Sequence, residues 1–336
     1  MSHVKHGSHM LDRLLPAGPS TRPGAVHTCL RRPFAGARGR HRPVVDDIPL
    51  DPSYTWTAAR ARGVTRAQIR ADGQRIARGL YLTRALEPDL AARCRAWMRV
   101  LPDDAAFGLH TAAALLGCPT RSSPGLHVVL RPRRVLPQRA GIVVHARALQ
   151  DDDIYMVDGL RVTSGAQTFL DLAADLLPGD LLAFGDALMR TGGLDAECLR
   201  RRLERADRVR GVVRAREWAP RLTAQSGSHP ESTLRYWLLT SNLPQPEPQV
   251  PIHDRWGREV AHADLGYARW KVALEYEGRQ HADSEQFGRD IERYSLMGAD
   301  GWLILRFARR HLGGPSVVVD RTRRALLSRG WRPGAG

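Results

Sequence analysis

Two short β-like runs near the C-terminus, each carrying a carboxylate, constrain the fold of this chain more than any other stretch. Asp264 lies at the end of the first run, and Glu275 follows eleven residues later in the apolar run that begins at Val272. Two adjacent strands of one sheet can bring such carboxylates together. Acidic oxygens that converge on one point favour a hard divalent cation, Mg²⁺ or Mn²⁺. The pattern therefore predicts a sheet that presents an acidic metal site.

The charge of the chain favours a polyanionic partner. The 336 residues carry a formal net charge of +16, and nucleic acid is the first candidate for such a protein. An acidic metal pocket surrounded by arginine also suggests phosphodiester chemistry. Lys5 and Lys271 are the only lysines, so nearly all positive charge is arginine, and arginine richness also arises from a GC-rich coding sequence. The charge alone therefore does not decide for DNA.

Cysteine usage and hydropathy exclude several classes of protein. Cys29, Cys94, Cys118 and Cys198 form no C-x-x-C pair, which argues against a zinc ribbon and against a disulfide framework. No apolar run approaches the length of a membrane span, and the N-terminus lacks a signal-peptide core. We therefore expect a cytoplasmic protein with no membrane partner.

A helical pattern followed by a β-like turn marks residues 51–84. Residues 57–62 predict a short helix, and Thr65 is placed to cap a second helix over residues 66–72. Residues 73–82 then alternate and turn like a β-wing. The pattern predicts a winged helix-turn-helix, and the alternative is an ordinary small α/β packing unit.

The second of these helices carries side chains that suit DNA. Arg66, Gln68 and Arg70 are expected to point outward from it, and Arg75 lies in the predicted wing. A helix that presents arginine and glutamine fits a major groove, where such side chains recognise base edges. We therefore expect these four residues to contact nucleic acid.

Residues 85–228 alternate between helical and strand-like patterns. We expect two helices in residues 85–125, strands at 126–130, 141–145 and 155–162, and helices at 166–177, 180–190 and 194–205. Residues 206–228 predict a basic helical linker that ends in a flexible break. His110, His127 and His145 lie far apart in the sequence, and we interpret them as scattered polar or partly buried side chains rather than as a metal site.

The chain is therefore expected to be α+β and multidomain. The expected divisions are a basic, disordered arm at 1–50, a winged-helix module at 51–125, a middle α/β region at 126–205, the basic linker at 206–228 and a C-terminal domain at 229–336. Residues 1–10 resemble a vector-derived leader in part, and we exclude them from the argument about the fold.

The C-terminal domain predicts the order helix, three strands, helix, strand, helix. Its third strand, residues 270–276, is nearly continuous in apolar character, as a central strand should be. Burial of Glu275 in such a strand implies a partner or a metal, because buried carboxylates are rare without one. Glu275 and Glu277 share one strand face, where two carboxylates repel unless a cation lies between them. A structural acidic cluster is the alternative to a metal site.

Residues 229–312 resemble the DUF559 family, relatives of the very-short-patch repair endonucleases within the PD-(D/E)XK nuclease superfamily. The residues that carry this resemblance are Glu231, Asp264, Val272 to Gly278, His281, Arg289-Asp290, Arg293, Gly301-Trp302 and Leu305-Arg306-Phe307. The resemblance implies a restriction-endonuclease-like α/β core with a mixed central sheet. Residues 55–120 resemble the winged-helix region of AbiEi-type antitoxins through Ala61 to Thr65, Gly79 to Tyr81 and Leu109 to Gly117.

The DUF559 resemblance implies a role for each acidic residue. Asp264 is the expected central Mg²⁺ ligand, Glu275 the second ligand, and Glu231 a further ligand or a residue that orients water. The metal polarises the phosphate and lowers the pKa of a bound water. His281 is the expected general base or acid. Arg289 and Arg306 are expected to neutralise charge on the phosphate.

One position departs from the superfamily pattern. A lysine is expected two residues after the second acid, and this chain has Glu277 there. Relatives in this branch often carry an acid at that place, so the change does not by itself imply an inactive enzyme. The role of activating water is left to Gln280, His281 or Lys271, in that order.

The sequence thus supports three hypotheses about function. The first is a Mg²⁺-dependent DNA endonuclease with an N-terminal DNA-binding module. The second is a DNA-binding regulator of antitoxin type whose nuclease-like domain is inactive, and the third is a structural or partner-binding protein. Besides DNA, the partners we consider are a second copy of the chain in a homodimer and a toxin or a repair or defence protein.

Overall fold

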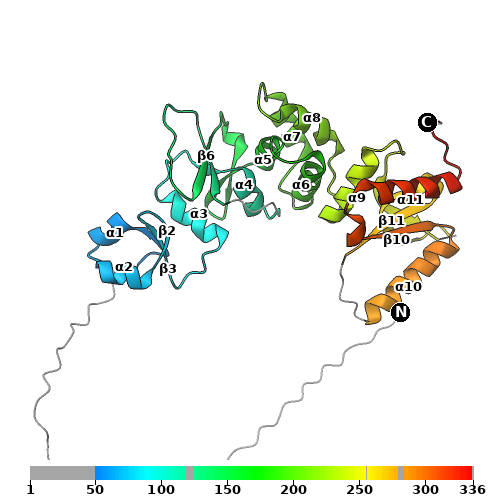
Figure 1. The fold of residues 1–336 in the computed structure, drawn as a ribbon, viewed down its shortest axis with the longest axis horizontal. Coiled ribbons are helices and arrows are strands. Elements are labelled where there is room, and N and C mark those ends of the chain that lie inside the picture. The colour runs from blue at the N-terminus through cyan, green and yellow to red at the C-terminus, as the bar shows by residue number, and fades with distance from the viewer. Residues whose placement is uncertain (1–49, 119–123, 255, 279–283, 335–336) are drawn as a thin grey trace, which may run out of the picture. The chain divides into compact units, whose positions relative to one another are not determined.

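The computed structural model describes residues 50–118, 124–254, 256–278 and 284–334, with side chains throughout except at residues 284–290. Within these ranges the chain forms three β-sheets and eleven α-helices, so the expected α+β class is confirmed (Figure 1). The arm predicted for residues 1–50 lies outside the described residues, apart from Leu50. No helix in the described ranges has both the length and the apolar character that a membrane span requires.

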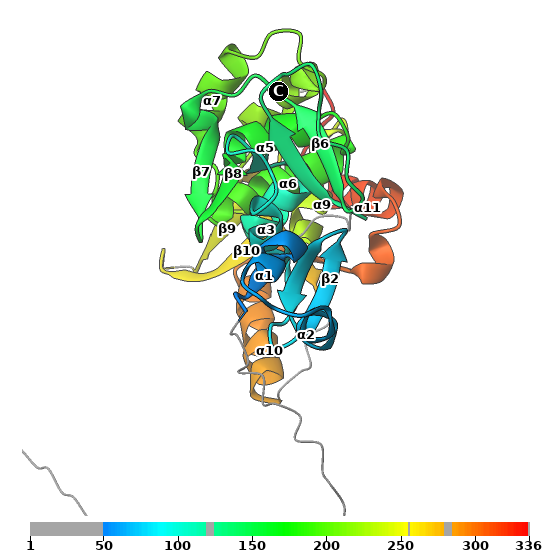
Figure 2. The same ribbon diagram turned by 90° about the vertical axis from the view of Figure 1, so that its left-hand side faces the viewer.

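The described chain opens with a three-stranded antiparallel sheet and two helices. The elements are β1 (Ser53–Thr55), α1 (Trp56–Ala61), α2 (Arg66–Asp72), β2 (Gly73–Ala77) and β3 (Leu80–Thr83). The strand order is β1-β3-β2, and Figure 2 shows α1 and α2 beside this sheet. Thr65 caps α2 as predicted, in a capping box with Gln68. Gly79, with φ +75°, allows the tight turn between β2 and β3.

A five-stranded sheet and six helices follow. The elements are α3 (Leu90–Met98), β4 (Ala106–Phe107), α4 (Leu109–Leu115), β5 (Leu126–Leu130), β6 (Ile142–Ala146), β7 (Ile154–Val157), β8 (Leu160–Thr163), α5 (Gly165–Leu172), α6 (Pro178–Arg190), α7 (Ala196–Glu204) and α8 (Val212–Trp218). The strand order is β6-β5-β4-β8-β7. Trp97 and Phe107 belong to one core of this region, which also takes in Leu80 and Leu82 of β3. Strand β3 therefore packs against α3.

The prediction of a single strand at residues 155–162 is wrong in one respect. This segment forms a hairpin of two strands, β7 and β8. Asp158 and Gly159 form the turn, with φ of +48° and +77°. A two-residue turn with both residues at positive φ matches the twist of the strands, and Asp-Gly is a preferred sequence for it. The Asp158-Gly159 pair was therefore the feature of the sequence that indicates this hairpin turn.

Arginines of residues 206–228 hold this segment against neighbouring helices. The segment forms α8 and the short 3-10 turn Ala219–Arg221. Arg214 donates to two main-chain carbonyl oxygens beyond the end of α5, at 3.0 and 2.6 Å. Arg216 donates to two carbonyl oxygens at the end of α7, at 2.9 and 2.7 Å. These side chains donate to carbonyl oxygens at helix ends, where the helix itself leaves acceptors unsatisfied.

The C-terminal region has the predicted order of helix, three strands, helix, strand and helix. The elements are α9 (His229–Leu239), β9 (Glu247–His253), β10 (Glu259–Tyr267), β11 (Val272–Glu277), α10 (Ser284–Ala299), β12 (Leu303–Ala308) and α11 (Pro315–Ser328). The strand order is β12-β11-β10-β9, with only the β11–β12 pair parallel, so the predicted mixed sheet is present. Leu274 packs with α9 and α11, and the adjacent Ala273 packs with Met297 of α10. The helices therefore cover both faces of the sheet (Figure 1).

A buried ion pair joins α6 to α9. The carboxylate of Asp186, which is fully buried, accepts from Nη2 of Arg235 at 2.7 Å on both oxygens. The same carboxylate accepts from the Ser232 hydroxyl at 2.8 Å and from the Thr223 amide at 2.9 Å. Three of these four bonds come from α9, the helix that carries Glu231, and they hold it against α6.

Candidate functional site

Asp264 and Glu275 lie across from each other where β10 and β11 separate. Leu265 and Leu274 are the last paired residues of this antiparallel ladder, so the next residues in register are Asp264 and Glu275. Asp264 Oδ2 accepts a hydrogen bond from the main-chain amide of Tyr276 at 2.7 Å. The structure thus brings the two predicted carboxylates to neighbouring positions on adjacent strands.

Glu275 is buried and has an arginine as its partner. Arg293 of α10 donates to both carboxylate oxygens, at 3.1 and 2.8 Å, and the Tyr294 hydroxyl donates to Oε2 at 2.7 Å. Burial raises the pKa of Glu275 and the Asp264 carboxylate raises it further, while Tyr294 and Arg293 lower it, and the result is above its ordinary value. The helical spacing of Asp290 and Arg293 favours a surface pair between these two residues rather than a catalytic role, and the structure places Arg293 on Glu275.

Glu231 lies near Asp264 but is held by the start of its own helix. Its Oε2 accepts from the Gly227 amide at 2.7 Å, and its Oε1 accepts from the Ser228 hydroxyl at 2.8 Å. Burial raises the pKa of Asp264, the Tyr276 amide lowers it, and the Glu231 carboxylate raises it, with a net rise. Glu231, Asp264 and Glu275 therefore form an electrostatically coupled row.

Each of the three carboxylates is engaged by protein donors in this structure. Both oxygens of Glu275 and both oxygens of Glu231 already accept hydrogen bonds. One oxygen of Asp264 accepts from a main-chain amide. In the described part of the chain, no group of three or more histidine, cysteine or carboxylate side chains is arranged to hold a metal ion. The guanidinium of Arg293 contacts both oxygens of Glu275, the residue expected to be the second metal ligand.

Glu277 also has an arginine partner. It forms an ion pair with Arg306 of β12, and the Arg306 guanidinium lies 4.4 Å from the centroid of the Tyr294 ring. Lys271 precedes β11, and its Nζ donates to the Asp300 carbonyl oxygen at 3.0 Å. Gln280 and His281 lie outside the described residues, and Arg289 belongs to α10 but its side chain is also outside them.

The predicted DNA-contacting residues have different local roles. Arg66 and Arg70 are exposed on α2, and no hydrogen bond or ion pair within the described residues engages their side chains. The Gln68 side chain, in contrast, accepts from the Thr65 amide at 2.8 Å and so belongs to the helix cap. Arg75 is exposed on β2, with its Nε 3.3 Å from the Ala77 carbonyl oxygen.

Three histidines that are distant in the sequence come together in the middle region. His127 Nδ1 lies 3.0 Å from His145 Nε2, with the two rings stacked at 5.2 Å between centroids. His110 meets His127 edge-on at 5.4 Å. Burial, followed by the charges of His145 and His110, lowers the pKa of His127 to about 4. The interpretation of these histidines as scattered was therefore wrong about their placement. The pairing of β5 with β6 brings His127 close to His145, and this pairing is not visible in the spacing of the residues along the chain.

Comparison with protein families places an antitoxin-like region in the middle of the chain. Residues 105–221, from β4 to the turn after α8, match the family described as AbiEi antitoxin C-terminal domain. The predicted antitoxin resemblance at residues 55–120 was thus placed too near the N-terminus. Of the stretches on which it rested, Leu109 to Gly117 lies inside the match, and the two earlier stretches lie before it.

Two proteins of Mycobacterium tuberculosis are similar to most of the chain. They are "Uncharacterized protein MT2308" of strain CDC 1551 / Oshkosh and "Uncharacterized protein Rv2248" of strain ATCC 25618 / H37Rv. Each is 32% identical over 251 residues, which cover 73% of this chain and 85% of the relative.

Proposed function

Because this chain belongs to the same family as the M. tuberculosis proteins Rv2248 and MT2308, and because its residues 105–221 match the AbiEi antitoxin C-terminal domain, we propose that it is a DNA-binding regulator of antitoxin type. The AbiEi match is the observation that carries the proposal. A toxin is then the expected protein partner. The match supports this function better than it supports a nuclease.

The first 35 described residues are the proposed DNA-binding module. Helices α1 and α2 lie between β1 and β2 in the chain, and β2 and β3 form a hairpin, which is the order of a winged helix-turn-helix. Arg66 and Arg70 on α2 have free guanidinium groups among the described residues, so no internal bond must break before they contact phosphates or base edges. Arg75 extends this basic surface onto the hairpin.

The test is DNA binding by the double variant Arg66→Ala/Arg70→Ala, measured by fluorescence anisotropy at several salt concentrations. If both arginines neutralise phosphates, the slope of log K against log salt falls by about 2, since each contact contributes about 1. The matched control is Arg321→Ala/Arg324→Ala, which removes the same charge from exposed positions on α11. Equal affinity and slope in the two double variants would show that α2 is not the DNA-binding helix.

A metal-dependent endodeoxyribonuclease is the second proposed function. The juxtaposition of Asp264 and Glu275 beside Glu231 favours it, together with the DUF559 resemblance of residues 229–312 and the mixed sheet. In this proposal Asp264, Glu275 and Glu231 hold Mg²⁺ or Mn²⁺, which requires Arg293 to release Glu275. Gln280, His281, Glu277, Arg289 and Arg306 keep the roles that the resemblance implies.

Nicking of supercoiled plasmid in Mg²⁺ or Mn²⁺ decides between the two functions. The nuclease proposal expects nicking by the full chain and its loss in Asp264→Ala. The control Glu259→Ala removes a carboxylate from the exposed start of β10 and should nick normally. DNA binding without nicking supports the regulator, and nicking that persists in Asp264→Ala at matched purity contradicts the site assignment.

A further inference from the structure

A basic and aromatic cavity lies between the β2–β3 hairpin and the loop that leads into β6. Its volume is about 790 Å³, within the range of roughly 300–1,000 Å³ that is typical of ligand pockets. The residues that line it are Trp56, Thr57, Arg75, Ala77, Arg78, Gly79 and Tyr81 from the first sheet and α1, and Gln138, Arg139 and Ala140 from the loop. The cavity is thus built from two regions of the chain that are distant in sequence.

The charge of the lining favours an anion. Arg75, Arg78 and Arg139 contribute three guanidinium groups, and none of the lining residues is acidic. No ion pair or hydrogen bond within the described residues engages the side chains of Arg78 and Arg139. Arg131, at the start of the same loop, in contrast pairs with Asp151. The cavity therefore holds uncompensated positive charge that a bound phosphate would neutralise.

The aromatic side chains provide a wall for a planar group. The Trp56 and Tyr81 rings lie 6.3 Å apart between centroids, and both are half-buried. Tyr54, which is buried, stacks on Tyr81 at 5.6 Å with an interplanar angle of 11°, and this contact fixes the position of the Tyr81 ring. Aromatic faces of this kind stack on nucleobases, with a contribution of about 1–3 kcal/mol per base in proteins that bind single strands.

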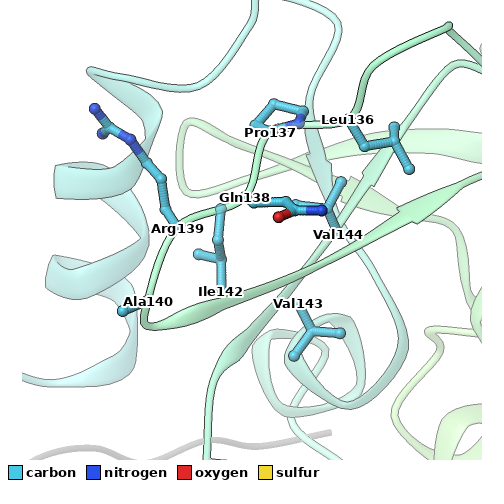
Figure 3. Close-up of a pocket in the computed structure, with 8 residues that line it drawn as sticks. All are labelled: Leu136, Pro137, Gln138, Arg139, Ala140, Ile142, Val143 and Val144. Carbon is cyan, nitrogen blue, oxygen red and sulfur yellow. The ribbon is translucent and has the colours of Figure 1, made fainter.

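The loop of residues 136–140 places polar groups and small side chains opposite this wall. Gln138, Arg139 and Ala140 also line a second, neighbouring cavity of about 550 Å³ beside β6. Figure 3 shows this second cavity, with the Arg139 side chain extended away from Val143. The Gln138 amide offers both a donor and an acceptor, as hydrogen bonding to a base edge requires. On the hairpin side, Gly79 has no atom within 4 Å of the position its Cβ would take, so nothing crowds the cavity there.

We propose that this cavity binds a nucleotide. The arginines bind its phosphates, and the base stacks against Trp56 and Tyr81. The proposal goes beyond the regulatory function above and does not depend on DNA binding by α2. A bound nucleotide contacts both the hairpin and the antitoxin-like region, to which the loop residues belong.

The experiment is isothermal titration of the full chain with each of the four ribonucleoside triphosphates, and separately with adenosine and with inorganic phosphate. We expect at least one triphosphate to bind, and to bind at least tenfold more tightly than either adenosine or phosphate. Arg78→Ala and Arg139→Ala should each weaken this binding about tenfold. The control Arg134→Ala removes an exposed arginine of the same loop that does not line the cavity, and it should bind as the natural chain does.

Three outcomes would overturn the proposal. Absence of binding by all four triphosphates rejects the site. Phosphate that binds as tightly as the triphosphates indicates an anion site without a base. Loss of DNA binding in Arg78→Ala and Arg139→Ala, with no triphosphate bound, assigns the cavity to the DNA surface. The variant Arg66→Ala/Arg70→Ala separates the two proposals, because it should lose DNA binding and keep nucleotide binding.

Discussion

Replacing Asp186 with alanine should destabilise the chain more than any surface substitution. The change removes four hydrogen bonds, two from Arg235 and one each from Ser232 and Thr223. Arg235 is buried and would keep only its bond to the Arg221 carbonyl oxygen at 2.8 Å, since its Nε has no partner in the described structure. A buried charge that loses its partner in this way costs about 3–5 kcal/mol.

The free energy of unfolding is measured by urea titration with circular dichroism as the signal. Asp186→Ala should lower it by about 3–5 kcal/mol. The control Asp320→Ala breaks an exposed pair in which the side chain of Asp320 is 61% exposed and that of Arg324 is 69% exposed, and it should cost only about 0.3–0.5 kcal/mol. The double variant Asp186→Leu/Arg235→Met removes both charges and should recover most of the loss, because apolar replacements of buried ion pairs are often neutral.

Two results would refute this account of the junction. A loss below about 1 kcal/mol in Asp186→Ala would show that water or a rearranged partner compensates Arg235. A double variant no more stable than the single variant would show that the charge of Arg235 is not the source of the loss.

Two further predictions concern the middle region. Because the pKa of His127 is lowered to about 4 in the folded chain, the unfolded chain binds the proton more readily, and stability that is present above about pH 6.5 should be lost as the pH falls towards 4. Melting temperatures between pH 7 and pH 4.5 should therefore fall less steeply in His127→Gln, while the exposed control His262→Gln should follow the natural chain. Gly159→Ala should cost about 1–2 kcal/mol in urea titration, because φ is +77° there although space for a Cβ is open. The same substitution at Gly298, within α10, should instead stabilise by about 0.5–1 kcal/mol, and equal effects at the two glycines would contradict the role of φ.

Local patterns in the sequence predicted most of the elements. The apolar run before Glu275 identified a central strand, and Thr65 identified the start of α2. Both features depend on residues within one element, where the period of side chains and the cap are local properties. The hairpin at Asp158 and Gly159 was also visible locally, but the flanking apolar residues suggested one longer strand.

Contacts between distant residues could not be predicted in the same way. The sequence placed Asp264 and Glu275 on adjacent strands, but it did not show that Arg293 would occupy both oxygens of Glu275. That contact depends on how α10 packs on the sheet. The approach of His127 to His145 depends in turn on the register of β5 and β6.

Several arginines that count in the formal net charge also make structural contacts within the fold. Arg214 and Arg216 each span two acceptors of the main chain, and Arg202, buried, contacts both Gln167 and Asp153. Arg202 is buried and paired with a carboxylate, so it counts in the formal +16 but adds little to the charge that a polyanion meets at the surface. A variant with lysine at these positions would preserve every charge but would replace each planar guanidinium with a more compact and more strongly hydrated ammonium group. The net charge of this chain and its use of arginine rather than lysine are therefore separate properties, since the second also affects how the helices are held together.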